Sequence, residues 1–273
     1  MHRPVLTPDK KTVGRRAGLI IAALAVAASF ASCKNESEPA PEPDNSYYPV
    51  AVGNFWIYAV ADTSWTAASL QGSQVNPSVA TASAYQFRET ITETFPDAAG
   101  KTAYRMVRAK RLNSTAEWRD DSVFVLSATD HAVVLNRNNA RTVELIFPAR
   151  EGRSWTFNAF NNDLNDTITA ETRQYSLVGQ SFTTGGGATG LPAVTYPATA
   201  TTNNTGAAAE NTLLRCIGYQ QVFAKGVGPV FRRRVTLAYF NYTQSNGNQA
   251  FPPNAYFGAF TRRETLIDYG PKP

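Results

Sequence analysis

Apolar and polar side chains alternate with a period of two along much of the chain. In residues 85–95, Phe87 and Ile91 share one face with Glu89, and the residues between them are polar. This alternation is typical of a half-buried antiparallel strand. Residues 231–239 repeat the pattern, and shorter runs separated by turn residues occur at 103–112, 117–127, 131–136, 141–147, 166–178 and 211–223. The pattern predicts an all-β protein, built as a curved antiparallel sheet or an open barrel.

Two stretches share one template. YPVAVGNFWIY begins at Tyr48 and FPAREGRSWTF begins at Phe147, 99 residues later. Proline favours an extended approach, glycine permits a turn, and the tryptophan and the next aromatic residue fall on one strand face. The template predicts two related halves, about 47–146 and 147–273, with an aromatic ligand clamp as the alternative. The matched positions are Pro49, Gly53, Trp56 and Tyr58 in the first stretch, and Pro148, Gly152, Trp155 and Phe157 in the second.

A third short motif, KGVGPV, precedes the strand predicted over residues 231–239. Its glycines, Gly226 and Gly228, flank one valine, and Pro229 follows. Two glycines in a strand-like run indicate a bulge or a close backbone approach. We expect a bend at this point and not a phosphate-binding loop, because no helix follows.

The N-terminal residues have the pattern of a lipoprotein signal peptide. Five basic residues precede a 14-residue apolar run, which is shorter than the roughly 20 residues that a membrane span needs. The run ends in FASC, which resembles a bacterial lipobox. We therefore predict a signal peptide over residues 1–32, lipidation of Cys33, and an acidic, proline-rich tether over residues 33–46. A single β-rich domain is expected over residues 47–273.

The three motifs, as YYPVAVGNFWIY, LIFPAREGRSWTF and VFAKGVGPVFRR, resemble an uncharacterised family of bacterial extracytoplasmic β-proteins, many of them Bacteroidota-type lipoproteins. The resemblance spans residue 47 to about residue 269. It implies a curved antiparallel sheet tethered outside the cytoplasm. The family has no established catalytic residues, so the resemblance assigns none here.

Charge excludes one class of partner. The formal net charge is +5, but the first 32 residues hold five Lys or Arg and one Asp, so the remainder carries only +1. This balance gives no electrostatic support for nucleic-acid binding. The basic runs at 105–111 and 232–234 are interpreted as solvated strand faces.

Candidate chemistry is sparse. Glu89 and Glu93 share an otherwise apolar face, but four residues along a strand span about 13 Å, too far for a paired-carboxylate site. We expect either to form an ion pair with Arg233 in a cleft or at a sheet end. The glycine-rich residues 185–190 precede prolines and no helix, so residues 183–211 are expected to be a flexible loop. Residues 161–166 are interpreted as a polar turn, with calcium binding as the alternative. The sequence predicts no catalytic residue, no metal site and no cofactor.

These features support three hypotheses of function. The first is a non-enzymatic envelope lipoprotein of the outer membrane, on the periplasmic side or the cell surface, that binds an envelope protein or an apolar or glycan ligand. The second is a structural role in a surface assembly. The third is a hydrolase acting on glycan, for which only isolated acids such as Asp120, Asp121, Glu89 and Glu93 are available.

Overall fold

A computed structural model of the chain describes residues 45–160, 170–206 and 209–272. Pro43–Pro273 form one compact unit. The described residues are almost entirely β-strand, with two short 3₁₀ helices, η1 (Asn45–Tyr47) and η2 (Gly187–Thr189). None of their helices is long and apolar enough to cross a membrane. The all-β prediction is confirmed.

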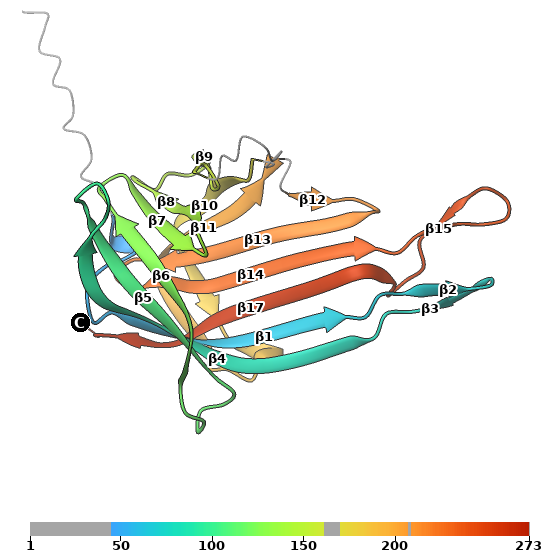
Figure 1. Ribbon diagram of the computed structural model, residues 1–273, viewed down its shortest axis with the longest axis horizontal. Helices are drawn as coiled ribbons and strands as arrows, with labels where there is room; N and C mark the ends of the chain where they lie inside the picture. Colours follow the sequence, from blue (N-terminus) through green and yellow to red (C-terminus); the bar gives the residue numbers. More distant parts are fainter. Residues whose placement is uncertain (1–44, 161–169, 207–208, 273) are drawn as a thin grey trace, which may run out of the picture. The chain divides into compact units, whose positions relative to one another are not determined.

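The main sheet consists of two antiparallel meanders of six strands each (Figure 1). Within each meander, every strand pairs with its neighbours in the order in which they occur along the chain. The first meander contains β1 (Phe55–Trp65), β4 (Ala80–Pro96), β5 (Thr102–Arg111), β6 (Arg119–Ala128), β7 (Ala132–Arg137) and β8 (Ala140–Ile146). The second contains β9 (Ser154–Thr156), β10 (Thr172–Thr184), β11 (Val194–Thr205), β13 (Arg215–Ala224), β14 (Gly228–Tyr239) and β17 (Tyr256–Gly270), and the short β12 (Glu210–Asn211) pairs with β13.

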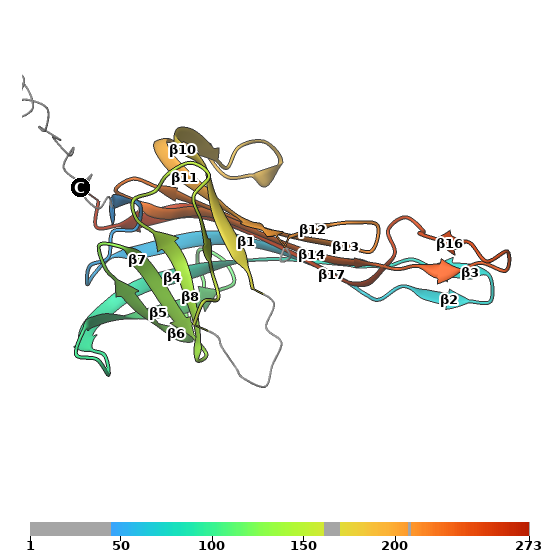
Figure 2. The same cartoon turned by 90° about the horizontal axis from the view of Figure 1, so that it is seen from above.

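The two meanders meet along two seams. The first seam is an antiparallel pairing of β1 with β17, the first and last long strands, with one register shift between Ile57 and Tyr58. At the second, the amide of Val143 in β8 donates to the carbonyl of Phe157, just after β9, at 2.8 Å. Trp155 Nε1 also donates to the Val143 carbonyl, at 2.8 Å. These bonds bring the two ends of the sheet together, and the result is a nearly closed barrel (Figure 2).

The repeated template forms the same turn at the start of both meanders. Gly53 and Gly152 both have positive φ, at 93° and 74°. The Gly53 amide donates to the carbonyl of Ile91 at 2.8 Å, and the Gly152 amide donates to that of Tyr175 at 3.0 Å. Each acceptor lies on the strand that follows in its meander, β4 or β10.

The return bonds also match. The Ile91 amide donates to the Asn54 carbonyl at 2.9 Å, and the Tyr175 amide donates to the Arg153 carbonyl at 3.0 Å. The side chains of Asn54 and Arg153 then donate to the carbonyl of the template proline, at 3.0 and 2.8 Å. Residues 99 positions apart therefore have the same structural role in the two turns.

The hydrophobic core lies inside the barrel, at the end where η1 leads toward β1. It is rich in aromatic side chains, because the template contributes one tyrosine or phenylalanine before each turn and a tryptophan after it. Trp56 is 1% exposed, whereas Trp155 is only partly buried against the core. The largest fully buried apolar members are Trp56, Tyr58, Tyr175, Phe223, Ile91, Met106, Leu126, Leu135, Leu145 and Val133.

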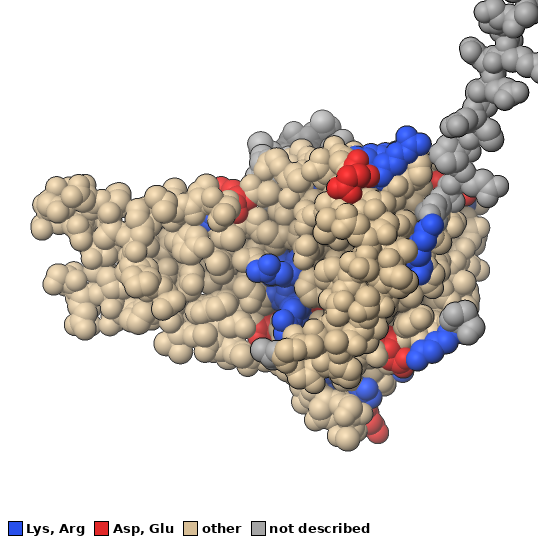
Figure 3. Space-filling view, turned by 180° about the vertical axis from the view of Figure 1, so that it is seen from behind, with Lys and Arg blue, Asp and Glu red and all other residues tan. Residues whose placement is uncertain are grey.

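Strands β1, β4, β14 and β17 run beyond the barrel and lead into two small hairpins, β2–β3 and β15–β16 (Figure 1). The hairpin strands are β2 (Ser69–Gln71), β3 (Gln74–Asn76), β15 (Tyr242–Thr243) and β16 (Gln249–Ala250). Residues 63–87 and 235–261 build this region, and neither segment contains Asp, Glu, Lys, Arg or His. We call it the uncharged extension. It is the uniformly tan part of the surface in Figure 3.

Two strand assignments need correction. Residues 183–211 are not a loop, because β11 lies within them and pairs with β10 and β13. The β-branched threonines of β11 fit a pleated surface, and Thr199, Thr201 and Thr202 are buried. The alternation analysis also missed β17, which completes the first seam. In the glycine motif, Gly226 lies in the turn between β13 and β14. A bulge follows at Val230, between the pairs Val222–Phe231 and Phe223–Pro229.

Candidate functional site

A buried carboxylate, Glu89 of β4, lies inside the barrel between two arginines. Arg108 of β5 donates from Nε to Glu89 Oε1 at 3.1 Å, and its Nη2 contacts the same oxygen. Arg232 of β14 donates from Nη1 to Oε1 at 3.1 Å and from Nη2 to Oε2 at 3.0 Å. It also reaches Glu264 Oε2 of β17 at 2.9 Å. Because β1 and β17 separate β4 from β14 in the sheet, the Arg232–Glu89 contact crosses the concave side of the barrel.

The strand period places this ion network directly above the apolar core. Side chains two positions apart share a face, and Ile91, Met106 and Val230 lie two positions from Glu89, Arg108 and Arg232 respectively. All three apolar residues are fully buried. Aromatic rings line the charged layer as well, with the Arg108 guanidinium 4.5 Å from the Phe87 ring centroid and that of Arg232 4.8 Å from Tyr58.

The network has a fixed charge near neutral pH. Burial alone would raise the pKa of Glu89, but the charges of Arg232 and Arg108 outweigh it and hold this pKa well below its usual range. Burial disfavours the charged form of each arginine too, but the Glu89 carboxylate reverses this and raises the pKa of Arg108 and Arg232. None of these three side chains exchanges a proton between about pH 5 and pH 9.

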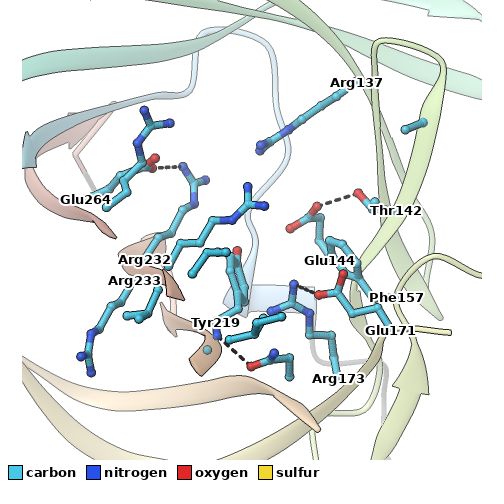
Figure 4. Close-up of a pocket in the computed structure, with 18 of the residues that line it drawn as sticks. Arg137, Thr142, Glu144, Phe157, Glu171, Arg173, Tyr219, Arg232, Arg233 and Glu264 are labelled. Carbon is cyan, nitrogen blue, oxygen red and sulfur yellow. Dashed lines mark hydrogen bonds and ion pairs between the residues drawn. The ribbon is translucent and has the colours of Figure 1, made fainter. Parts of the chain in front are cut away.

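A cavity of about 400 Å³ lies on the other side of the ion network (Figure 4). Strand alternation places Ile217, Tyr219, Arg232, Arg234 and Thr236 around it, from β13 and β14. Residues of β5, β7, β8, β10, β11 and β17, together with Phe157 and Glu171, complete the wall. Seven arginines and three glutamates are among the lining residues, namely Arg108, Arg137, Arg173, Arg232, Arg233, Arg234 and Arg262, with Glu144, Glu171 and Glu264. Of these, Arg233 turns its side chain away from the cavity (Figure 4).

Arg173 of β10 is the least exposed arginine of the cavity wall. It is 4% exposed, and its guanidinium lies 4.3 Å from the Phe157 ring centroid and 3.5 Å from that of Tyr219. Its Nη2 pairs with Glu171. Its Nε and Nη1 are buried and make no hydrogen bond with the described residues, and the same holds for Arg137 Nε. Buried polar groups normally have partners, so these nitrogens need an explanation.

The structure separates the three residues predicted to form an ion pair. Glu89 is paired, but with Arg232 and Arg108. Glu93 is exposed and pairs with Arg105 on the outer surface at 3.1 Å. The register shifts between Ile91 and Glu93 in the pairing with β5, so a bulge turns Glu93 to the opposite face from Glu89.

Arg233 is exposed and points away from the cavity (Figure 4). The prediction chose Arg233 because it shares the odd-numbered positions with the apolar Phe231, Val235 and Leu237. The structure instead buries Arg232, which follows the bulge at Val230. The interpretation of both basic runs as solvated faces is also corrected, since Arg108 and Arg232 are each only 7% exposed.

The glycine motif packs on the first template. Trp56 Nε1 donates to the Val227 carbonyl at 2.6 Å, and Tyr58 donates its hydroxyl to the Pro229 carbonyl at 2.9 Å. Gly226 and Gly228 have positive φ, at 73° and 101°. A Cβ on Gly228 would lie 2.9 Å from Trp56 Nε1. The motif therefore packs on the core and accepts hydrogen bonds from both aromatic side chains of the first template.

The remaining candidates lie apart from the cavity or outside the described residues. Asp120 and Asp121 are exposed. Among the described residues, no group of three or more His, Cys, Asp and Glu side chains could hold a metal ion. Cys33 lies outside these residues, as does the whole stretch 161–166.

Sequence reasoning missed Arg137, Glu144, Glu171 and Arg173 entirely. Arg173 did carry a signal, because it lies two positions before Tyr175 just as Glu89 lies two before Ile91. Both face the tryptophan of their template, as Trp155 opposite Arg173 and Trp56 opposite Glu89. An alignment of the two stretches by the strand that follows each template places Glu89 opposite Arg173. It thereby indicates a charged residue on the inner face of both strands.

No known protein family, curated protein or solved structure matches the chain. The resemblance to extracytoplasmic β-proteins thus stays a prediction, and the geometry alone must support a function.

Proposed function

We propose that this is a lipid-anchored extracytoplasmic binding protein, without catalytic activity, that holds a small polar ligand in the barrel cavity. One observation carries the proposal. A cavity of about 400 Å³ is lined by charged and polar side chains whose positions are fixed by strands, rings and ion pairs. This volume is in the range of small-molecule sites.

The charge states favour binding over catalysis. Arginine stays protonated at any physiological pH, so it can orient an acceptor but cannot serve as a general acid or base. The depressed pKa of Glu89 is opposite to the raised pKa that a glycosidase acid needs. The hydrolase alternative therefore loses one of its candidate acids, and Glu93, Asp120 and Asp121 lie on the outer surface.

The location rests on the N-terminal sequence. The basic start, short apolar run and FASC support export and acylation at Cys33, with anchoring in the outer membrane, facing the periplasm or the cell surface. Labelling cells with an alkyne fatty acid tests this, with wild type compared with Cys33→Ala. We expect label only on the wild type, and equal labelling of both forms contradicts the anchor.

Filling the cavity tests the binding function. Residues 43–273 are screened against a library of small polar molecules by thermal shift. Ile217→Trp places a large ring at the cavity wall, and Ile267→Trp makes the same change at an exposed site on β17, 39% exposed and outside the cavity lining. We expect ligands that stabilise wild type and Ile267→Trp but not Ile217→Trp. Equal stabilisation of all three proteins contradicts binding in the cavity.

A further inference from the structure

We propose that the ligand of the cavity is a small organic acid with one net negative charge, and that its acidic group is held by Arg173 and Arg137. This inference rests on the proposed binding function and names the class of ligand. Three observations support it: the pairing of the cavity charges, the donors of Arg173 and Arg137 that have no acceptor among the described residues, and the position of Arg234 on β14.

The cavity has more positive than negative charge. Four of its seven arginines form ion pairs, with Glu89, Glu264, Glu171 or Asp62 as their partners. Arg137, Arg233 and Arg234 form none with the described residues, and Glu144 is the lining acid without one. Glu144 instead accepts a hydrogen bond from Thr142 Oγ1 at 2.9 Å. Since Arg233 points outward, two unpaired arginines and one unpaired glutamate face the cavity, and one negative charge balances them.

The donors of Arg173 indicate where that charge is bound. A guanidinium has five N–H donors, and the single N–H on Nε and the two on Nη1 are without an acceptor among the described residues. The Phe157 and Tyr219 rings hold the group in place, so little side-chain entropy is lost when an acceptor binds. Burying these donors without a hydrogen-bond acceptor costs free energy. An anionic oxygen offsets this cost better than a neutral oxygen, because hydrogen bonds between charged groups are stronger.

Arg137 supplies the second contact. It lies on β7, where its guanidinium is 4.7 Å from the Phe124 ring centroid, and its Nε is buried without an acceptor. Figure 4 shows it pointing into the cavity. Arg234 is exposed like Arg233, but it lines the cavity, shares the face of Arg232 and lies opposite Tyr219 of β13, so it extends the positive charge along β14. A carboxylate between these groups gains hydrogen bonds from Arg173 and Arg137 and a longer-range attraction from Arg234.

The test pairs each acid with its own neutral analogue. Wild-type residues 43–273 are titrated with a panel of small organic acids and the corresponding primary amides, among them glucuronate with glucuronamide and benzoate with benzamide. Amide and acid have nearly the same shape, so a difference in affinity reports the charge. We expect acids to bind at least about tenfold more tightly than their amides, as charge-assisted hydrogen bonds imply.

Variants then locate the charge. Arg173→Gln is expected to lower acid affinity by about tenfold or more and to leave amide affinity nearly unchanged. If Arg173→Gln does not fold, the neighbouring pair on β14 decides. Arg234→Gln removes a cavity charge and weakens acid binding, whereas Arg233→Gln removes the same charge from the outer face and does not.

The outcomes separate the two proposals. Amides that bind as tightly as their acids overturn the assignment of an anionic ligand but leave the binding function standing. Equal effects of Arg234→Gln and Arg233→Gln overturn the assignment as well. If no acid and no amide of the panel binds, both the inference and the proposed function are overturned.

Discussion

Glu89 illustrates how a single buried charge becomes part of a fold. It is fully buried, and its cost is offset only because two arginines bind both of its oxygens. The arginines depend on it equally, since each is buried next to aromatic rings. Removing the carboxylate thus leaves two arginines without their shared partner.

We predict that Glu89→Gln lowers the free energy of unfolding by about 3–5 kcal/mol at pH 7, the range seen when one partner of a buried pair is removed. Urea unfolding measures it. Glu93→Gln is the matched control, because that side chain is 56% exposed and its surface pair is worth at most about 1 kcal/mol. Similar losses for both variants contradict a buried network.

The lowered pKa of Glu89 predicts that the contribution of this residue to stability depends on pH. The pKa of Glu89 is lower in the folded than in the unfolded state, so its stabilisation is complete above the unfolded pKa of about 4.3 and is lost as pH falls through the folded pKa. We expect the stability gap between wild type and Glu89→Gln to narrow below about pH 4. Urea midpoints at several acidic pH values measure it, and a constant gap down to about pH 2 contradicts the prediction.

Gly228 combines two constraints that can be separated. Its φ of 101° strains any other residue, and an added Cβ would meet the Trp56 ring. Gly226 has a φ of 73° but no atom within 4 Å of its Cβ position. We predict that Gly226→Ala costs about 1 kcal/mol from backbone strain and that Gly228→Ala costs clearly more. Chemical denaturation compares them, and equal costs mean that the ring moves aside freely.

At the scale of elements, the two templates make the same turn but bury their tryptophans unequally. Trp56 is covered by the glycine motif, whereas Trp155 packs at the edge of the core. We predict that Trp56→Ala costs about 3–5 kcal/mol and that Trp155→Ala costs less. Thermal and urea unfolding of both variants test this. A larger loss for Trp155→Ala contradicts the burial described here.

Alternation found most strands because their polar and apolar faces differ. It failed at β11, where threonines and small residues give no contrast, and at β17, where Arg262 and Glu264 occupy the inner face. The turn templates, by contrast, could be predicted from spacing alone, since positive φ and extended proline restrict the residues allowed there.

The site was largely beyond sequence analysis for a related reason. Its glutamates and arginines are paired across strands that are distant along the chain, such as Arg232 with Glu89, and a single sequence does not show such pairs. Two bulges added to the difficulty, because each reverses which side chains face inward after it. Glu89 was found as an anomaly on an apolar face, but its partners were not.

At the scale of the whole folded unit, the second seam is the weaker closure of the barrel. It depends on a few bonds around Val143, including the one from Trp155 Nε1. We predict that Trp155→Phe, which removes only that donor, speeds amide hydrogen exchange at Val143 and Phe157. The amides of Tyr58 and Leu266, partners at the first seam, serve as internal controls. Unchanged exchange at Val143 contradicts a role for the indole in closure.

The uncharged extension has a consequence for how the molecule responds to its surroundings. Its two segments contain no side chain that ionises below about pH 9, so acid and salt leave its surface chemistry as it is. Any association made there through amide, hydroxyl and aromatic groups keeps its strength as ionic strength rises. An acid in the arginine cavity is instead released by added salt, because ions screen the attraction that holds it. A salt titration therefore distinguishes contacts at one end of the sheet from binding at the other.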